Sequence, residues 1–329
     1  MNTHSERIIR WGIIGPGKIA HKFARDLKEI PHTELYAVAS RHPGRAEAFA
    51  NEHNAAKAFG NHEALAQDPT VDAVYIATPH SLHEYYSVMC LSHKKAVLCE
   101  KPLAMNTTQV EKMIAASKTH QVLLMEAMWT AFLPHFQAAV EMVRDGVLGE
   151  ITSIEADFGF HPPFNPESRL FSKQLGGGSL LDIGIYPLFL SMAMLGKPVN
   201  IDAHATFVET GVDSSCQITL QYDRNAKAQL FSTVLKETPT VAVIRGREGT
   251  LKIHPRFHES SSFTVEKSGK TERFTFTNRG EGFVHEIEHF CNLLRNGETE
   301  SPVMTFDNSR ELIGLLDAVR EKIGLHYED

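Results

Sequence analysis

Short apolar runs alternate with helical patterns from residue 8 to about residue 126, and this alternation limits the possible folds more than any other feature. The strand-like runs are IIRWGIIG, ELYAVAS, DAVYIAT, KAVLCE and VLLME. After the first run, Ile19, Phe23, Leu27 and Ile30 recur at the spacing of one helix face. Strands that alternate with helices form a parallel sheet. The first part of the chain therefore predicts a parallel sheet with helices packed on it.

From about residue 150 onward, one strand-like run follows another, in EITSIEADFGF, VNIDAHATFVE, CQITLQY, AKAQLFSTVL, TVAVIRG and TLKIH. Consecutive strands usually pair antiparallel. Helical patterns return at 283–295 and 307–323, and 329 residues are enough for two ordinary domains. We expect an α/β Rossmann domain, with a doubly wound parallel sheet, over residues 1–128. An α+β domain with an open, mainly antiparallel sheet should follow over residues 129–329.

The charge and the cysteines exclude several classes of protein. Lys and Arg number 33 against 40 Asp and Glu, without long runs of one sign, whereas nucleic-acid binding needs a basic face. The N-terminal apolar run is too short for a signal peptide, and no later stretch approaches the roughly 18 apolar residues of a membrane span. The four cysteines form no C-x-x-C pair, which favours reduced thiols. We expect a cytoplasmic protein that binds neither nucleic acid nor membranes.

The segment GPGKIA follows the first strand and opens the first helix. Gly15, Gly17 and Ala20 fit the G-x-G-x-x-G/A arrangement: a tight turn, a close approach of backbone to pyrophosphate, and a small residue where helix meets sheet. The phosphates would lie at the helix N-terminus. A glycine turn that binds nothing is the alternative, but the strand before it and the helix after it favour a dinucleotide site.

The end of the second strand indicates which dinucleotide binds. An NAD enzyme usually places Asp or Glu there to bind the ribose 2'-hydroxyl. Here Ser40 holds that position, Arg41 follows it, and Arg45 is close in the sequence. A guanidinium can bind a 2'-phosphate that an acid would repel. The residues favour NADP over NAD, with Arg41 as an ordinary solvated turn residue as the alternative.

Two further segments, ATPHSLH and LCEKPLAMN, come where strands should end on the ligand side of the sheet. With GPGKIA, and above all with Glu100-Lys101-Pro102, they resemble the glucose-fructose oxidoreductase and inositol dehydrogenase family, Gfo/Idh/MocA. The segments MEAMWTAF, RDGVLGEI, GGGSLLDIGIYPL and IRGREGTLKI extend the resemblance over nearly the whole chain. Within that family, the chain is most similar to the branch of dimeric dihydrodiol dehydrogenases and NADP-dependent xylose dehydrogenases, because D-x-G-x-Y ends in Tyr186. This chain has Ala131 at a position where that branch is expected to have Arg, so the resemblance does not identify the exact substrate.

The resemblance implies an NADP-dependent dehydrogenase that acts on a small hydroxylated substrate, either a sugar, a polyol or a trans-dihydrodiol, and that forms a homodimer. It implies catalytic roles for Lys101, Tyr186 and Asp182, and a substrate pocket with Trp129, Phe158 and Ile183. The cofactor residues it implies are Gly15, Gly17, Lys18, Ile19, Ser40, Arg41, Arg45, Thr78, Pro79, His80, His83, Glu100 and Lys101. A non-catalytic NADP sensor of the same fold is the alternative, but such a protein should have lost Lys101 or its partner.

Without the resemblance, the catalytic candidates have structural interpretations. Lys101 can be a solvated strand end. Ser179 and Asp182 form an S-x-x-D helix start, in which Asp182 would favour the positive end of the helix. Asp182 and Tyr186 are four residues apart and would share a helix face, and Pro187 would interrupt the helical hydrogen bonding.

A competing motif is His285-Glu286-Ile287-Glu288-His289, which reads H-E-x-x-H. On a helix this motif can place two imidazoles on one zinc ion, with Glu286 as the general base of a hydrolase. No third ligand is identifiable downstream, so we expect no metal site. The two histidines should be solvated or hydrogen-bonded surface residues. We expect no metal at His80 and His83 either, although the resemblance places their loop beside the nicotinamide.

Overall fold

The structure is a computed structural model that describes residues 7–327 and divides into two compact units. The first unit runs to residue 132 and also includes residues 279–310, and the second contains 133–278 and the residues after 310. We expected a single crossing, after residue 128, whereas the chain here passes between the units three times. Residues 1–6, part of the segment considered as a signal peptide, lie outside the described residues.

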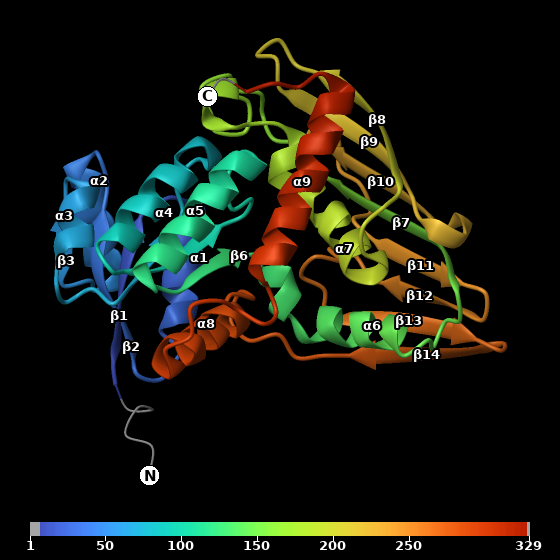
Figure 1. Ribbon diagram of the computed structural model, residues 1–329, viewed down its shortest axis with the longest axis horizontal. Coiled ribbons are helices and arrows are strands. Elements are labelled where there is room, and N and C mark those ends of the chain that lie inside the picture. The colour runs from blue at the N-terminus through green and yellow to red at the C-terminus, as the bar shows by residue number, and fades with distance from the viewer. Residues whose placement is uncertain (1–6, 328–329) are drawn as a thin grey trace. The chain divides into compact units, whose positions relative to one another are not determined.

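The first unit contains a six-stranded sheet in the order β3-β2-β1-β4-β5-β6, with every pair parallel (Figure 1). The strands are β1 (Ile9–Ile14), β2 (Thr33–Ala39), β3 (Lys57–Phe59), β4 (Ala73–Ile76), β5 (Ala96–Glu100) and β6 (Leu124–Ala127). The strand order reverses between β1 and β4, and ligands of such sheets bind at the carboxyl ends of the strands near this point. The predicted doubly wound parallel sheet is confirmed.

Helices cover this sheet. Of the stripe predicted for the first helix, Phe23, Leu27 and Ile30 are buried and Ile19 is half-buried, and Ile30 lies beyond the helix end. The helices are α1 (Lys18–Leu27), α2 (Pro43–His53), α3 (His62–Gln67), α4 (His83–Ser92), α5 (Thr107–His120) and α8 (Val284–Asn296). Phe23 of α1 is fully buried and stacks on Tyr75 of β4, with 3.8 Å between ring centroids. The spacing of apolar residues in α1 therefore reflects its packing on the sheet.

A late segment of the chain completes the core of the first unit. The carboxylate of Asp26, on α1, accepts hydrogen bonds from the backbone N–H groups of Glu281 and Phe283, at 2.8–2.9 Å. The rings of Trp11 and Phe290 lie 5.1 Å apart between centroids. Residues 279–310 are thus part of the same hydrophobic core as β1 and α1.

The second unit is built on an eight-stranded sheet in the order β14-β13-β12-β11-β7-β10-β9-β8 (Figure 1). Its strands are β7 (Ile151–Gly159), β8 (Asn200–Phe207), β9 (Asp213–Gln221), β10 (Lys227–Thr233), β11 (Ala242–Gly246), β12 (Gly249–Ile253), β13 (Ser262–Lys267) and β14 (Lys270–Thr275). Only β7 and β10 pair parallel among these described strands. The expected, mainly antiparallel sheet is confirmed.

The helices of the second unit include α6 (Pro134–Arg144) and α7 (Ile185–Leu195), and α9 (Phe306–Ile323) begins in the first unit and continues in the second. A π-helical turn, η5 (Leu180–Gly184), leads directly into α7. By length and mean hydropathy alone, residues 173–195 could cross a membrane, whereas we expected no such stretch from the sequence. The most apolar 18-residue window within them is 89% buried within the structure, as is typical of a core helix.

Candidate active site

The turn between β1 and α1 has the properties of a phosphate-binding site. Gly15 has φ +91°, and a Cβ atom there would lie 2.7 Å from the carbonyl oxygen of Ala77, so glycine is required. Gly17 caps α1 without any side-chain hydrogen bond, and the first turn contains no acidic residue. A Cβ atom on Gly17 would meet nothing within 4 Å. The N–H groups at the start of α1 are therefore accessible to an anion, which fits the pyrophosphate of a dinucleotide.

Ser40 follows β2, at the position that would face the adenosine ribose. Its backbone N–H donates to the carbonyl of Phe59, and its Oγ accepts from the N–H of His42 at 3.2 Å. Arg41 and Arg45 are exposed. Burial lowers the pKa of His62, and the positive charge of Arg41 lowers it further, so this guanidinium lies near α3. The segment Ser40–Arg45 contains no acid, which suits a phosphate better than a hydroxyl.

The loop after β4 is joined to the loop after β5 by the ring of His83. Its Nδ1 lies 2.9 Å from the carbonyl oxygen of Pro102, and its Nε2 lies 2.9 Å from that of Thr78. Because carbonyls only accept, both contacts are hydrogen bonds only when both ring nitrogens carry protons. His83 is fully buried and His80 nearly so. The Oγ1 of Thr78 is buried with no hydrogen-bond partner among the described residues, which leaves it for a ligand.

Lys101 comes directly after β5 and is half-buried among carboxyl groups. Its backbone N–H donates to Glu100, which also accepts a hydrogen bond from the hydroxyl of Tyr75. Burial raises the pKa of Glu126 to about 7, and the positive charge of Lys101 is one of the effects that oppose this rise. The Lys101–Pro102 peptide is cis. Lys101 is thus half-buried at the carboxyl edge of the sheet, close enough to Glu126 for its charge to act on that carboxyl group.

In the second unit, the start of the predicted catalytic helix is held by a buried carboxylate. The Oδ2 atom of Asp213 accepts hydrogen bonds from Ser179 Oγ at 2.6 Å and from the N–H of Leu180 at 2.8 Å. A Cβ atom on Gly178 would lie 2.2 Å from Asp213, which explains a glycine there. Ser179 is the N-cap residue of η5, but its hydroxyl donates to Asp213 and makes no cap hydrogen bond to the helix. Asp182 lies in the first turn of η5, as the S-x-x-D interpretation expects. Pro187, which has no N–H to donate, lies in α7 just after the π-helical turn η5, so the helical hydrogen bonding changes next to it, as expected.

Asp182 and Tyr186 have different surroundings within this unit. Asp182 is buried and its Oδ1 accepts a hydrogen bond from Arg169 Nη1 at 2.7 Å. Tyr186 is 6% exposed. Its ring centroid lies 5.6 Å from that of Phe158 and 4.9 Å from that of His258. Phe158 and His258 stack on each other at 4.2 Å, so two rings form a wall beside the phenol.

The remaining pocket candidates lie in separate places. Trp129 belongs to the first unit, where its ring stacks on Phe283 with 5.1 Å between centroids. Ala131 is buried in the same short turn. Ile183 is buried within η5 of the second unit. Sequence reasoning missed Arg169 and His258, because both lie outside regular elements and within no motif.

The H-E-x-x-H segment lies on α8 but does not form a zinc site. Glu286 is fully buried, and burial raises its pKa well above the ordinary value, so it is no solvent-facing base. His289 Nε2 lies 2.8 Å from Ser301 Oγ, and His285 Nε2 accepts a hydrogen bond from the N–H of Arg279. Both histidines are half-buried, so they are less exposed than expected. Within residues 7–327, no third His, Cys, Asp or Glu joins them as a ligand.

Comparison with protein families gives two adjoining matches. Residues 9–128 match a model described as an oxidoreductase family with an NAD-binding Rossmann fold. Residues 136–252 match the GFO/IDH/MocA C-terminal domain. The two matches together cover most of the chain and follow the division into a parallel and a mainly antiparallel sheet.

Individual proteins resemble the chain over almost its full length. Trans-1,2-dihydrobenzene-1,2-diol dehydrogenase of Xenopus laevis is 37% identical over 331 residues, which cover 97% of this chain and 99% of the relative. The 3-ketoreductase KijD10 of Actinomadura kijaniata, solved with NADP and TDP-benzene, has a TM-score of 0.87 at 29% identity, covering 96% and 98% of the two chains. The aldose-aldose oxidoreductase of Caulobacter crescentus, solved with glycerol, has a TM-score of 0.87 at 25% identity, covering 96% and 97%.

Proposed function

Because this chain belongs to the Gfo/Idh/MocA oxidoreductase family, we propose that it is an NADP-dependent dehydrogenase of a sugar, a polyol or a trans-dihydrodiol. The similar proteins are named dehydrogenases and oxidoreductases of diols and sugars, so the chain is an enzyme that acts on CH–OH groups rather than a cofactor sensor. The reaction is the transfer of a hydride between the nicotinamide and a hydroxyl-bearing or carbonyl carbon.

The observation that carries the proposal is the arrangement at the carboxyl edge of the parallel sheet. The accessible N-terminus of α1 follows β1, and Lys101 follows β5 on the same edge, with only β4 between these two strands. Thr78 adds a buried hydroxyl with no partner among the described residues. An anion-binding turn and a held cation on one edge suit a dinucleotide with its reacting end near Lys101.

The preference for NADP is supported by Ser40, Arg41 and Arg45. Residues 40–45, which follow β2, include no carboxylate that could bind the ribose hydroxyl of NAD. They instead include the exposed guanidinium groups of Arg41 and Arg45. Arg41 and Arg45 would hold the 2'-phosphate by charge-assisted hydrogen bonds, which are stronger than neutral ones.

For the chemistry, bound NADP supplies the acceptor or donor of the hydride. Tyr186, as its phenolate, takes the proton of the substrate hydroxyl while the hydride passes to the nicotinamide, because the oxygen must lose this proton for the carbonyl to form. In the reverse direction, its phenol returns a proton to the carbonyl oxygen. Lys101 provides the positive charge that favours the phenolate. Asp182, held by Arg169, orients the substrate or the lysine. The aromatic wall of Phe158 and His258 keeps water from the phenol. In the competing assignment, Lys101 is itself the base.

Tyr186→Phe distinguishes the two assignments. If tyrosine is the acid/base, kcat falls by about 100-fold or more, and the affinity for NADP stays nearly unchanged. The ionisation that limits oxidation at low pH also disappears. Tyr222→Phe is the matched control, since Tyr222 is a buried tyrosine of the same unit whose hydroxyl bonds Ser191. A Tyr186→Phe enzyme with normal turnover and pH profile would leave Lys101 as the base.

The substrate class is tested by a screen. Aldoses, polyols and trans-dihydrodiols are offered with NADP, and formation of reduced nicotinamide is followed by absorbance. Turnover of one of these classes supports the proposal. Activity on none of them, in a protein that binds NADPH, contradicts it.

We also propose a homodimer in the cytoplasm. In the second unit, Val199, Phe207 and Leu235 are large apolar residues with 64%, 45% and 49% exposure, in or next to β8 and β10. Because β8 is an edge strand of the eight-stranded sheet, pairing with a second copy would cover exposed side chains beside it. All four cysteines are free and buried, which suits a reducing compartment. Light scattering should give twice the mass of one chain, and Phe207→Asp should shift it toward the monomer.

A further inference from the structure

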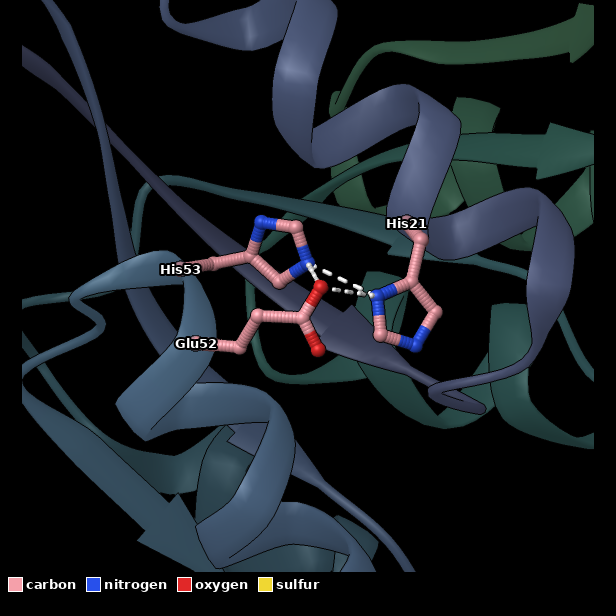
Figure 2. A group of neighbouring side chains, drawn as sticks. All are labelled: His21, Glu52 and His53. Atoms are coloured by element: carbon pink, nitrogen blue, oxygen red, sulfur yellow. Dashed lines mark hydrogen bonds and ion pairs between the residues drawn. The ribbon is translucent and has the colours of Figure 1, made fainter.

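Two neighbouring helices of the first unit bring three metal-ligating side chains together, and no part of the proposed reaction uses them (Figure 2). His21 comes from α1, and Glu52 and His53 come from the end of α2. His21 Nδ1 lies 2.8 Å from His53 Nε2 and 3.1 Å from Glu52 Oε1. The Glu52 oxygen lies 3.3 Å from His53 Nε2. Three donor atoms thus form a closed triangle.

The triangle has the chemistry of a transition-metal site. Each donor atom can present a lone pair toward the centre, and the two facing nitrogens cannot both carry a proton at this separation. Two imidazoles and one carboxylate suit zinc and its first-row neighbours, whereas magnesium and calcium prefer oxygen ligands alone. Two ligands of a tetrahedral zinc ion, bound at about 2.0–2.1 Å, lie about 3.3 Å apart. The three donor atoms lie 2.8–3.3 Å apart, so each pair reaches that spacing if its atoms move by about half an ångström or less.

The surroundings combine one anchored ligand with an open side. The side chain of His53 is 3% exposed, and its Nδ1 points away from the other two residues (Figure 2). The Glu52 side chain is 57% exposed and that of His21 is 31% exposed. An ion can therefore enter from solvent beside Glu52 and keep water in its remaining positions.

We propose that His21, Glu52 and His53 form a binding site for one divalent transition-metal ion of the zinc type. The ion joins α1 to α2, so it stabilises the folded first unit by binding the native state only. The H-E-x-x-H motif on α8 is not part of this site. The proposal is independent of which substrate the enzyme oxidises.

The test is calorimetric titration of the chelator-treated full chain with ZnCl₂. We expect one high-affinity ion per chain and a rise in melting temperature with zinc. Glu52→Gln and His21→Ala should each weaken this binding by about 100-fold or more, since even residues that only support ligands cost 10- to 100-fold. Titration with Co²⁺ should give the visible absorption of a low-symmetry nitrogen and oxygen site.

Two variants serve as controls. Glu47→Gln makes the same change at another exposed position of α2, and His289→Ala removes a histidine of the rival motif. Both should keep the high-affinity ion. The proposal is overturned if the wild type takes up no ion tightly, if Glu52→Gln binds as well as Glu47→Gln, or if the ion is lost in His289→Ala.

Discussion

Replacing Gly17 by alanine should separate cofactor binding from the stability of the fold. The backbone of Gly17 has φ −98°, which any residue adopts, and the added Cβ would meet nothing within 4 Å. The variant should therefore fold normally. Its free energy of unfolding should stay within about 1 kcal/mol of the wild type, because alanine also restricts the unfolded chain.

The effect on the cofactor should be much larger. The methyl group would take the space through which the pyrophosphate approaches the first N–H groups of α1. A hydrogen bond to a charged group contributes about 1.5–3 kcal/mol. Loss of one such bond corresponds to about 10- to 150-fold weaker binding of NADPH. Fluorescence titration gives the dissociation constant, and urea unfolding gives the stability.

Two other glycines make this experiment specific. Gly314→Ala adds a methyl within α9 that also meets nothing within 4 Å, and it should leave NADPH binding unchanged and raise the free energy of unfolding by no more than about 1 kcal/mol. Gly15→Ala should instead destabilise the fold, because its Cβ would collide with the Ala77 carbonyl and its φ is positive. If Gly17→Ala binds NADPH as tightly as the wild type, the phosphate does not lie at this helix end.

Three further predictions concern the cofactor, a buried acid and the rival motif. Arg41→Ala should weaken NADPH binding about ten-fold or more and leave NADH unchanged, and equal losses for both would refute the phosphate contact. Burial raises the folded-state pKa of Glu126 from 4.5 to about 7, so the folded state holds a proton that the unfolded chain releases, and stability falls as pH rises between these values. Glu126→Gln should therefore gain up to about 3 kcal/mol relative to the wild type at pH 8 but little at pH 4, as measured by urea unfolding. His285→Ala and His289→Ala should neither release zinc nor make turnover sensitive to chelators, and loss of a stoichiometric ion in either variant would revive the hydrolase interpretation.

The features that sequence reasoning could predict are those carried by neighbours along the chain. The strand, the glycine turn and the amphipathic helix of residues 9–27 follow one another directly, so spacing alone predicts the β1–α1 unit. In the structure Ala20, Phe23, Ala24 and Leu27 recur on the buried face of α1, and Ile13 and Ile14 are buried on β1. The catalytic role of Lys101 could not be predicted from spacing, because only the family resemblance distinguished this residue from a solvated strand end.

The features that remained hidden depend on contacts between distant residues. The carboxylate that holds the start of the proposed catalytic helix is Asp213, 34 residues after Ser179. The partner of Asp182 is Arg169, in an irregular segment. His21 and His53 lie 32 residues apart on two helices, so no local spacing reveals their contact. The strands β3 and β14 also escaped, because their side chains are mostly exposed and show no apolar alternation.

The hydrogen bonds that Asp26 accepts from the backbone of residues 281 and 283 affect the order in which the chain folds during synthesis. Domains generally fold during synthesis as they leave the ribosome, the N-terminal one first. Here the first 132 residues emerge early, but Asp26 and Trp11 receive their partners only when residues 281–290 have been translated. The part of the core that packs against residues 281–290 therefore stays exposed while about 150 residues of the other unit are translated. A nascent chain that stalls before residue 279 yields no complete nucleotide-binding unit, and chaperone binding should be strongest in that interval.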